Sequence, residues 1–252
     1  AARAHIQQET AEDPVALYRQ VNVSMTKHLA KAAINAGVKR FIFISSAGVH
    51  GRESKKPFTE QDPPAPDTDY TRSKLEAEQI LFALAKGTNM QVTILRLPLV
   101  YGAEVKGNFL SMLHILEKNI PLPLGSINNK RSLLYIDNLL DFIVRCLDHP
   151  AVENEIFLLA DEAAISTPDL LRLLRDQLHS KTWIFSLPIW VLKVMAFVVH
   201  RQEPLNKLMA SFEVDGSKAR RLLDWHPPVS MRSGIAATTA AFRKKIEEGP
   251  LD

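Results

Sequence analysis

A Tyr-x-x-x-Lys pair that follows a strand ending in serine constrains this chain more than any other feature. Tyr70 and Lys74 are four residues apart, so on a helix they lie on one face and can share a pocket. Upstream, the mostly apolar run at residues 40–44 reads as a buried strand and ends in Ser45-Ser46. We therefore expect Ser46, at the carboxyl end of that strand, to reach the same pocket.

These three side chains suit the reversible oxidation of a secondary alcohol. A phenol titrates near pH 10, and a neighbouring cation favours the phenolate. We expect Tyr70 to remove the hydroxyl proton, Lys74 to lower the pKa of Tyr70, and Ser46 to hydrogen-bond the same substrate oxygen. A nicotinamide would take the hydride.

The order of the predicted elements favours a parallel α/β sheet. We expect a helix from Asp13-Pro14 to Gly37, a strand over residues 41–44, a helix from Tyr70 to about residue 85 and a strand over 92–97. A proline-rich loop over 51–69 precedes the second helix. Strand, helix and strand in this order imply right-handed crossovers. The first helix carries an apolar stripe that predicts its packing face, formed by Leu17, Val21, Met25 and Leu29.

The pattern changes from about residue 101. Helices are expected near residues 108–118, 136–147, 218–223 and 231–245 and from Thr167, with a strand over 156–160. The apolar run that begins at Leu187 and ends at Val199 is shorter than the roughly 20 residues that span a bilayer, and it contains Lys193. We interpret it as a buried or partner-facing helix. The alternative is a surface helix that touches a membrane or a lipid-linked sugar.

Several motifs in a fixed order match a known family. They are Val21-Asn22-Val23, residues 37–46, the Tyr70 to Lys74 segment, residues 95–102 and 131–138, and Trp225-His226-Pro227. Their order resembles the extended short-chain dehydrogenase/reductase family, in particular its NAD-dependent nucleotide-sugar 4-epimerases. The resemblance implies a Rossmann-like doubly wound parallel sheet with a smaller C-terminal substrate lobe. Residues 1–105 would belong to the dinucleotide-binding domain, and residues 106–252 mainly to the lobe, with elements returning to the main sheet.

The family's glycine-rich turn has no counterpart in this sequence. Ten glycines are present, but none forms a Gly-x-Gly-x-x-Gly motif. The opening Ala1-Ala2-Arg3 resembles the turn that follows the family's fourth strand. We therefore expect the family's first three strands to lie outside this sequence, and the activity of the chain by itself stays open.

The resemblance also implies the roles of further residues. Lys74 would hold the nicotinamide ribose, Asn22 would brace Lys74 through water, and His50 stands where the family usually has Tyr. The cofactor would be NAD, with NADP left open, bound by Ala1, Ala2, Asn22, Ser45, Tyr70, Lys74, Pro98 and Val100. A sugar-nucleotide substrate would contact Ser46, Asn108, Arg131 and Lys207. A homodimer would form through the helices at residues 14–36 and 70–85.

The residues around the serine distinguish between the reactions of this family. Ala47-Gly48 fills the positions where dehydratases carry an acidic pair, and Cys146, inside an apolar helix, does not suit an epimerase that works at two carbons. The resemblance therefore favours a 4-epimerase of UDP-glucose and UDP-galactose or their N-acetyl forms. The alternatives are an NAD(P)-dependent alcohol dehydrogenase or reductase on an apolar or lipid-linked substrate, and a non-catalytic cofactor-sensing or scaffold protein.

Composition narrows the class of partner. The 31 Lys and Arg against 28 Asp and Glu leave a net charge of only +3, without a basic cluster interleaved with aromatics, so nucleic acid is not expected as a partner. A single cysteine excludes an internal disulfide and fits a reducing, cytoplasmic compartment. No metal site is expected.

Overall fold

Three parallel strands, in the order β1–β2–β5, form the main sheet. The structure is a computed structural model that describes residues 13–161 and 163–248; Ala1 and Ala2 lie outside the described residues. Strand β1 (Arg40–Ser46) pairs with β2 (Gln91–Leu97), which pairs with β5 (Ile156–Leu158). Ser46 lies opposite Leu97, so the carboxyl ends of β1 and β2 are level. This is the edge at which parallel α/β sheets bind ligands.

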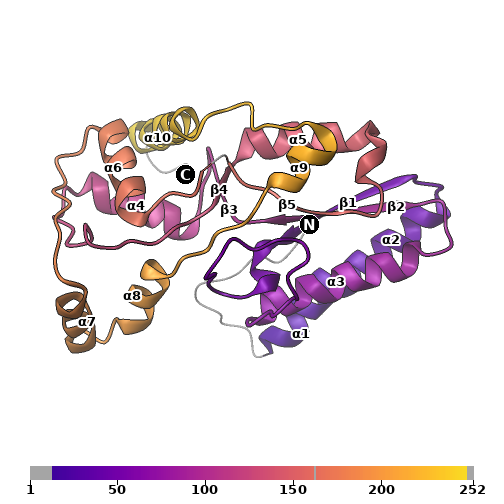
Figure 1. The fold of residues 1–252 in the computed structure, drawn as a ribbon, viewed down its shortest axis with the longest axis horizontal. Helices are drawn as coiled ribbons and strands as arrows, with labels where there is room; N and C mark the ends of the chain where they lie inside the picture. The colour runs from indigo at the N-terminus through magenta and orange to yellow at the C-terminus, as the bar shows by residue number, and fades with distance from the viewer. Residues whose placement is uncertain (1–12, 162, 249–252) are drawn as a thin grey trace.

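Helices cover both faces of this sheet. Figure 1 shows α2 (Met25–Asn35) and α3 (Asp69–Ala85) below it, and α5 (Ile136–Asp148) and α9 (Ser217–Leu223) above it. A short α1 (Pro14–Tyr18) and a π-helical segment (Arg19–Ser24) lead into α2. Apolar clusters fill both layers, one around Phe43, Leu81 and Ile94 and the other around Phe142 and Phe157. The predicted Rossmann-like α/β fold is confirmed.

A second, smaller layer holds much of the C-terminal half. Strands β3 (Leu99–Tyr101) and β4 (Leu133–Tyr135) pair in parallel, and α4 (Gly107–Glu117), α6 (Thr167–Leu178) and α10 (Met231–Glu248) pack into one apolar cluster with them. Strand β5 and helices α5 and α9, which follow residue 106, belong to the main sheet and its cover. The proposed boundary at residue 105 stays a prediction.

Two helices project from this lobe. Figure 1 shows α7 (Ile189–Val198) and α8 (Gln202–Met209) side by side at one corner of the molecule, with the chain running back from α8 towards the main sheet. Among the described residues, none of the helices combines the length and the apolar character needed to cross a membrane.

The predicted packing face of the first helix is wrong. Met25 and Leu29 are 54% and 60% exposed. The buried face lies one residue further on, where the chain places Tyr18, Asn22, Thr26 and Ala30. Two of those side chains are polar, so the apolar stripe did not mark the buried face.

Candidate active site

Helix α3 presents Tyr70, Lys74 and Glu78 on one face, at i, i+4 and i+8. Thr68 and Thr71 form a reciprocal capping box at its start, in which the Thr71 backbone N–H donates to Thr68 Oγ1 over 3.2 Å. The turn after β1 approaches this end of the helix closely. A Cβ at Gly48 would lie 2.9 Å from Thr71 Cγ2, so the approach depends on glycine.

Ser46 and Tyr70 meet at the carboxyl end of β1. The Ser46 Oγ accepts the backbone N–H of Gly48 over 3.1 Å and hydrogen-bonds the phenol of Tyr70. Burial raises the pKa of Tyr70, the Ser46 hydrogen bond opposes that rise, and the nearby phenol of Tyr18 adds to it. Tyr70 is therefore neutral at pH 7 in this state, and its proton is available for donation.

Lys74 is buried beneath the strand, with 3% of its surface exposed. Its Nζ donates to the Ile44 carbonyl over 2.8 Å and lies 4.7 Å from the centroid of the Phe43 ring. Burial lowers the pKa of Lys74 to about 8, against the opposing charge of Glu78. The described groups that shift the pKa of Tyr70 do not include Lys74. The role of Lys74 in lowering that pKa, and its contact with the ribose, stay predictions.

Asn22 is buried and supports the first turn of α3. Its Nδ2 donates to Ser73 Oγ over 3.0 Å, and Ser73 Oγ donates to the Tyr70 carbonyl over 2.7 Å. The π-helical segment that carries Asn22 is a widened turn of a kind frequent at functional sites. The predicted water-mediated contact with Lys74 is untested.

A buried polar network, not predicted from the sequence, lies directly behind the site. Arg96 donates to the Glu78 carboxylate, at 3.2 Å from Nε and 2.6 Å from Nη2, and Ser45 Oγ donates to the same carboxylate. His50 Nε2 lies 2.9 Å from Arg96 Nη1. Because a guanidinium only donates, this nitrogen accepts, and His50 is neutral. Burial, followed by the charge of Arg96, lowers the pKa of His50 to about 4, while Asp62 opposes the shift.

Two sequence signals could have revealed this network. Glu78 follows Lys74 by one helical turn, and Arg96 interrupts an otherwise apolar strand. The network occupies the Ser45 hydroxyl, whose expected contact with the cofactor is untested. His50, which stands where the family usually has Tyr, is buried.

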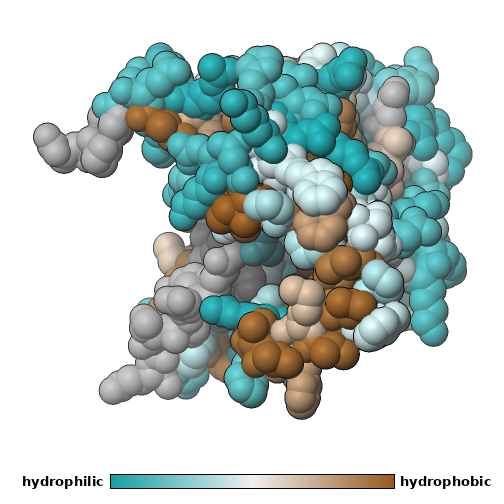
Figure 2. Space-filling view, turned by 90° about the vertical axis from the view of Figure 1, so that its left-hand side faces the viewer, coloured by the Kyte–Doolittle hydropathy of each residue, from teal (hydrophilic) through white to brown (hydrophobic). Residues whose placement is uncertain are grey.

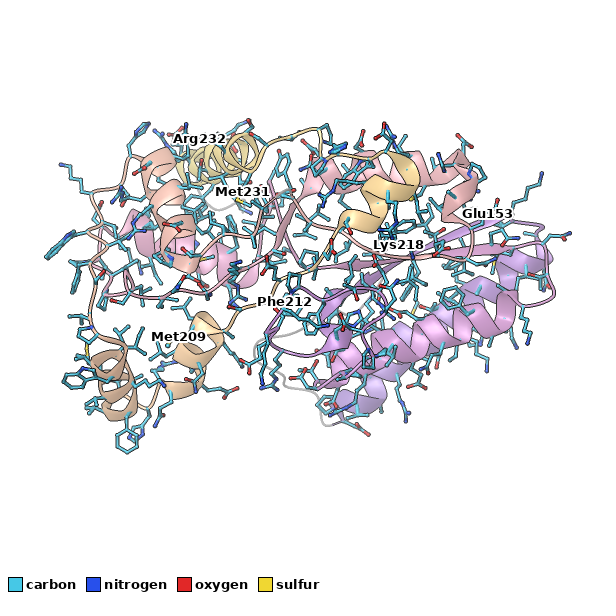
Figure 3. All side chains as sticks on the ribbon, in the orientation of Figure 1. Glu153, Met209, Phe212, Lys218, Met231 and Arg232 are labelled. Atoms are coloured by element: carbon cyan, nitrogen blue, oxygen red, sulfur yellow. The ribbon has the colours of Figure 1, made fainter. Side chains whose placement is uncertain are left out.

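Aromatic rings connect this network to the C-terminal half. His50 stacks on Phe58 at 5.4 Å between ring centroids, and Phe58 meets Phe212 edge-on at 5.8 Å. In Figure 3, Phe212 lies near the centre of the molecule, on the segment that runs from α8 to the sheet. Its carbonyl accepts the backbone N–H of Ser132, next to Arg131. The loop over residues 51–68 is thus held between the two halves.

The structure places Arg131 beside Lys207, but each of the two cationic side chains already has a partner within the protein. Arg131 Nη1 donates to the Lys207 carbonyl over 3.0 Å, and burial lowers the pKa of the Arg131 guanidinium. The Lys207 ammonium pairs with Glu203 at 2.8 Å. Asn108 is exposed in the first turn of α4. Their contacts with a substrate are untested.

The end of β2 provides an apolar surface beside the serine strand. Pro98 is buried directly after β2, and Val100 in β3 is half-buried. A separate cavity of about 310 Å³ lies between α4 and α10, but none of the predicted site residues lines it. Within the described part of the chain, no three His, Cys, Asp or Glu residues are placed to hold a metal ion.

Comparison with known proteins identifies the relatives of this chain. The model of the NAD dependent epimerase/dehydratase family matches residues 1–160. The UDP-glucose 4-epimerase of Vibrio cholerae is 44% identical over 245 residues, which cover 96% of this chain and 75% of the relative. An N-acetyl-alpha-D-glucosaminyl-diphospho-ditrans,octacis-undecaprenol 4-epimerase of Escherichia coli O157:H7 is 29% identical over 177 residues, which cover 69% of this chain and 53% of that protein.

The fold also matches solved structures. The UDP-glucuronic acid 4-epimerase from Bacillus cereus, in complex with UDP-glucuronic acid and NAD, superimposes with a TM-score of 0.76 at 23% identity. The match covers 96% of this chain and 73% of that one. At this identity the likeness concerns the fold.

Proposed function

The chain belongs to the NAD-dependent epimerase/dehydratase family, and we propose that it interconverts the C4 epimers of a UDP-hexose, UDP-glucose and UDP-galactose or their N-acetyl forms. The observation that carries the proposal is the hydrogen-bonded pair of Ser46 and Tyr70, with Lys74 one helical turn away, at the carboxyl end of β1. The relative from Vibrio cholerae supports the choice of sugar nucleotide.

The donor groups at this edge of the sheet suit a nicotinamide cofactor. The Tyr70 hydroxyl and the Lys74 ammonium are hydrogen-bond donors that match the hydroxyls of a ribose, and Pro98 offers an apolar surface for a ring. Bound NAD would supply the acceptor for the C4 hydride and return it to the other face of the sugar.

In the proposed reaction Ser46 hydrogen-bonds the O4 oxygen of the sugar and holds it beside Tyr70. The Tyr70 oxygen takes the O4 proton as C4 is oxidised and gives it back as C4 is reduced. Before the oxidation Tyr70 loses its own proton to solvent, and Lys74 favours the resulting anion. Between the two hydride transfers Tyr70 carries the O4 proton and is neutral. The keto-sugar turns over between the two hydride transfers, so that the second reaches the opposite face.

We assign the diphosphate of the substrate to Arg131, with Asn108 and Lys207 beside it. A planar guanidinium matches phosphate oxygens, and Arg131 keeps donors beyond those it shares with the backbone. To bind the ligand with its whole guanidinium, Arg131 would need to turn Nη1 from the Lys207 carbonyl towards the phosphate.

Three residues argue against two other reactions of this family. Ala47 is fully buried and, with Gly48, leaves no acid beside Ser46 to eliminate water. Burial raises the pKa of Cys146 to about 12 inside the core, which makes it a poor proton donor or nucleophile.

The test is product analysis with each UDP-hexose and NAD. Formation of the C4 epimer without net NADH supports the proposal, whereas a 4-keto-6-deoxy product or stoichiometric NADH contradicts it.

A lipid-linked N-acetylhexosamine is the second candidate substrate. The relative from Escherichia coli carries such a substrate in its name, and α7 exposes a largely apolar face. The same product analysis with a polyprenyl diphosphate sugar distinguishes the two candidates.

We also propose that the protein forms a homodimer and that it is located in the cytoplasm. The exposed Met25 and Leu29 on α2, next to the face of α3, supply an apolar surface for a second copy. The lone, buried Cys146 is compatible with a reducing compartment.

A further inference from the structure

The outward face of α7 is apolar and uncovered in the described part of the chain. Trp190, Val194, Phe197 and Val198 are 69%, 55%, 66% and 70% exposed. Their spacing of four, three and one residues places them on a single face of the helix. Leu192 and Ala196, on the opposite face, are buried.

Further exposed apolar residues lie on either side of the helix in the sequence, and we count them with the α7 residues as one patch. Trp183 is 66% exposed and stacks on Phe185, and Val199 is 61% exposed. Figure 2 shows brown side chains gathered at the lower part of the face to which α7 belongs. Isolated exposed apolar residues need no explanation, but a contiguous patch with several aromatic rings marks a binding surface.

Positive charge predominates in the segment that carries this patch. Residues 181–209 contain four cations, Lys181, Lys193, Arg201 and Lys207, and one carboxylate, Glu203. That carboxylate pairs with Lys207. Among the described residues, Lys181, Lys193 and Arg201 form no ion pair. A second copy docked face to face would bring these cations together, whereas an anionic surface would neutralise them.

We propose that α7 lies in the interface of an anionic phospholipid bilayer, parallel to its plane. The rings of Trp183, Trp190 and Phe197 would enter the boundary between headgroups and acyl chains, and the flanking cations would contact lipid phosphates. A helix of ten residues is too short to cross the bilayer, which leaves it on the surface. This docking surface goes beyond the proposed reaction and does not depend on it.

The surface is mechanically connected to the predicted diphosphate site. Helix α8 follows α7, and its last residues are held by Asn129, whose Nδ2 donates to the carbonyls of Leu208 and Ala210 over 3.0 and 3.1 Å. Arg131 donates to the Lys207 carbonyl in the same turn. Docking through α7 would therefore hold Arg131 at a fixed distance from the membrane surface.

Vesicle binding tests the proposal. The protein is sedimented with vesicles of phosphatidylcholine alone and with vesicles that also contain phosphatidylglycerol. We expect binding to the phosphatidylglycerol vesicles, with a blue shift of tryptophan fluorescence, because two of the three tryptophans lie in the patch and Trp225 is buried. The double variant Trp190→Ser, Phe197→Ser should bind at least tenfold more weakly, and Lys193→Glu should weaken binding to the anionic vesicles.

The matched control is Leu140→Ser, Val144→Ser on α5. These two residues are also exposed and one turn apart, but Asp137, Asp141 and Asp148 flank them. We expect this variant to bind vesicles like the parent protein, and the unfolding midpoint of each variant reports whether it folds.

Equal binding of both double variants, or no vesicle binding by the parent protein, would contradict the proposal. Loss of a dimer in the α7 variant, without vesicle binding by the parent, would instead make the patch an interface between copies. Absence of epimerisation would reject the proposed reaction and leave this result unchanged.

Discussion

At the residue scale, the site depends on two ionisable groups whose pKa values burial shifts in favour of the neutral forms, although a pKa of about 8 leaves Lys74 mainly charged at pH 7. The pKa of Tyr70 is raised and that of Lys74 is lowered to about 8, both mainly by burial. A proton can then move onto or off Tyr70 at modest cost when substrate and cofactor change the local charge.

Replacing the phenol tests this assignment. Tyr70→Phe should lower turnover of the UDP-hexose by roughly 10²–10⁴-fold, because it removes the proton carrier and keeps the ring. Tyr135→Phe removes a phenol outside the site and should leave turnover within about twofold. Steady-state rates at saturating substrate give the comparison, and a Tyr70→Phe protein as active as its parent would remove the central residue of the mechanism.

The buried pair of Glu78 and Arg96 should be structurally costly to break. Both side chains are almost completely buried, at 2% and 4% exposure, so Glu78→Gln leaves an uncompensated guanidinium in the core. We expect a loss of about 3–5 kcal/mol in the free energy of unfolding. Glu76 lies on the same helix as Glu78 and forms an exposed ion pair with Arg19. Glu76→Gln breaks that pair and should cost less than about 1 kcal/mol. Urea unfolding measures both, and similar losses would contradict the burial argument.

His50 should make the free energy of unfolding depend on pH in the acidic range. Its pKa is about 4 in the folded protein and near 6.5 when unfolded, so below pH 6.5 the unfolded chain binds more protons and stability falls as the pH falls. The loss from this group is about 2 kcal/mol at pH 5. His50→Gln keeps an acceptor for Arg96 but does not titrate, so the difference in unfolding free energy between pH 7 and pH 5 should shrink by that amount. The exposed His28→Gln is the control, and an unchanged difference in the His50 variant would contradict the assignment.

At the scale of elements, sequence patterns predicted the helices and strands of the main sheet better than their buried faces. The strand ending at Ser46 and the helix carrying Tyr70 and Lys74 were predicted correctly, because a serine-terminated apolar run and a capped helix are local signals. The stripe through Met25 and Leu29 was misassigned, since the buried face of that helix carries polar side chains, one of which, Asn22, hydrogen-bonds Ser73 of α3.

The elements that the sequence did not reveal are short or lack a buried face. Strands β3 and β4 have three residues each, and a pattern with a period of two is hardly visible over that length. Helix α8 buries none of its residues, so it has no apolar stripe, and it contains Pro204. Helix α7 was expected, but which side of it faces the protein depends on the lobe it packs against.

The misassigned stripe on α2 leads to a prediction about assembly. If Met25 and Leu29 face a second copy, Leu29→Asp should turn a dimer into a monomer, because a carboxylate cannot be buried unpaired in an apolar interface. Leu147→Asp, at a comparably exposed position on α5, should leave the dimer intact. Light-scattering mass at micromolar concentration decides between them, and a monomeric parent protein would exclude this interface.

At the scale of the whole molecule, one chain of contacts joins the proposed chemistry to the proposed substrate lobe. It runs from the Glu78 and Arg96 pair through His50, Phe58 and Phe212 to the backbone beside Arg131. None of these contacts is local in sequence, so no single motif could predict them. The contacts hold the loop over residues 51–68 against both halves, next to the end of β1.

The most direct test of the account follows the hydrogen at C4 of the sugar. UDP-galactose carrying deuterium at C4 is incubated with the protein and NAD in ordinary water, and the products are analysed by NMR and mass spectrometry. Because the hydride leaves and returns within one site, we expect UDP-glucose that retains deuterium at C4, with no net formation of NADH. Loss of the label to solvent, or its accumulation in NADH together with an oxidised sugar, would contradict epimerisation by the Ser46, Tyr70 and Lys74 group.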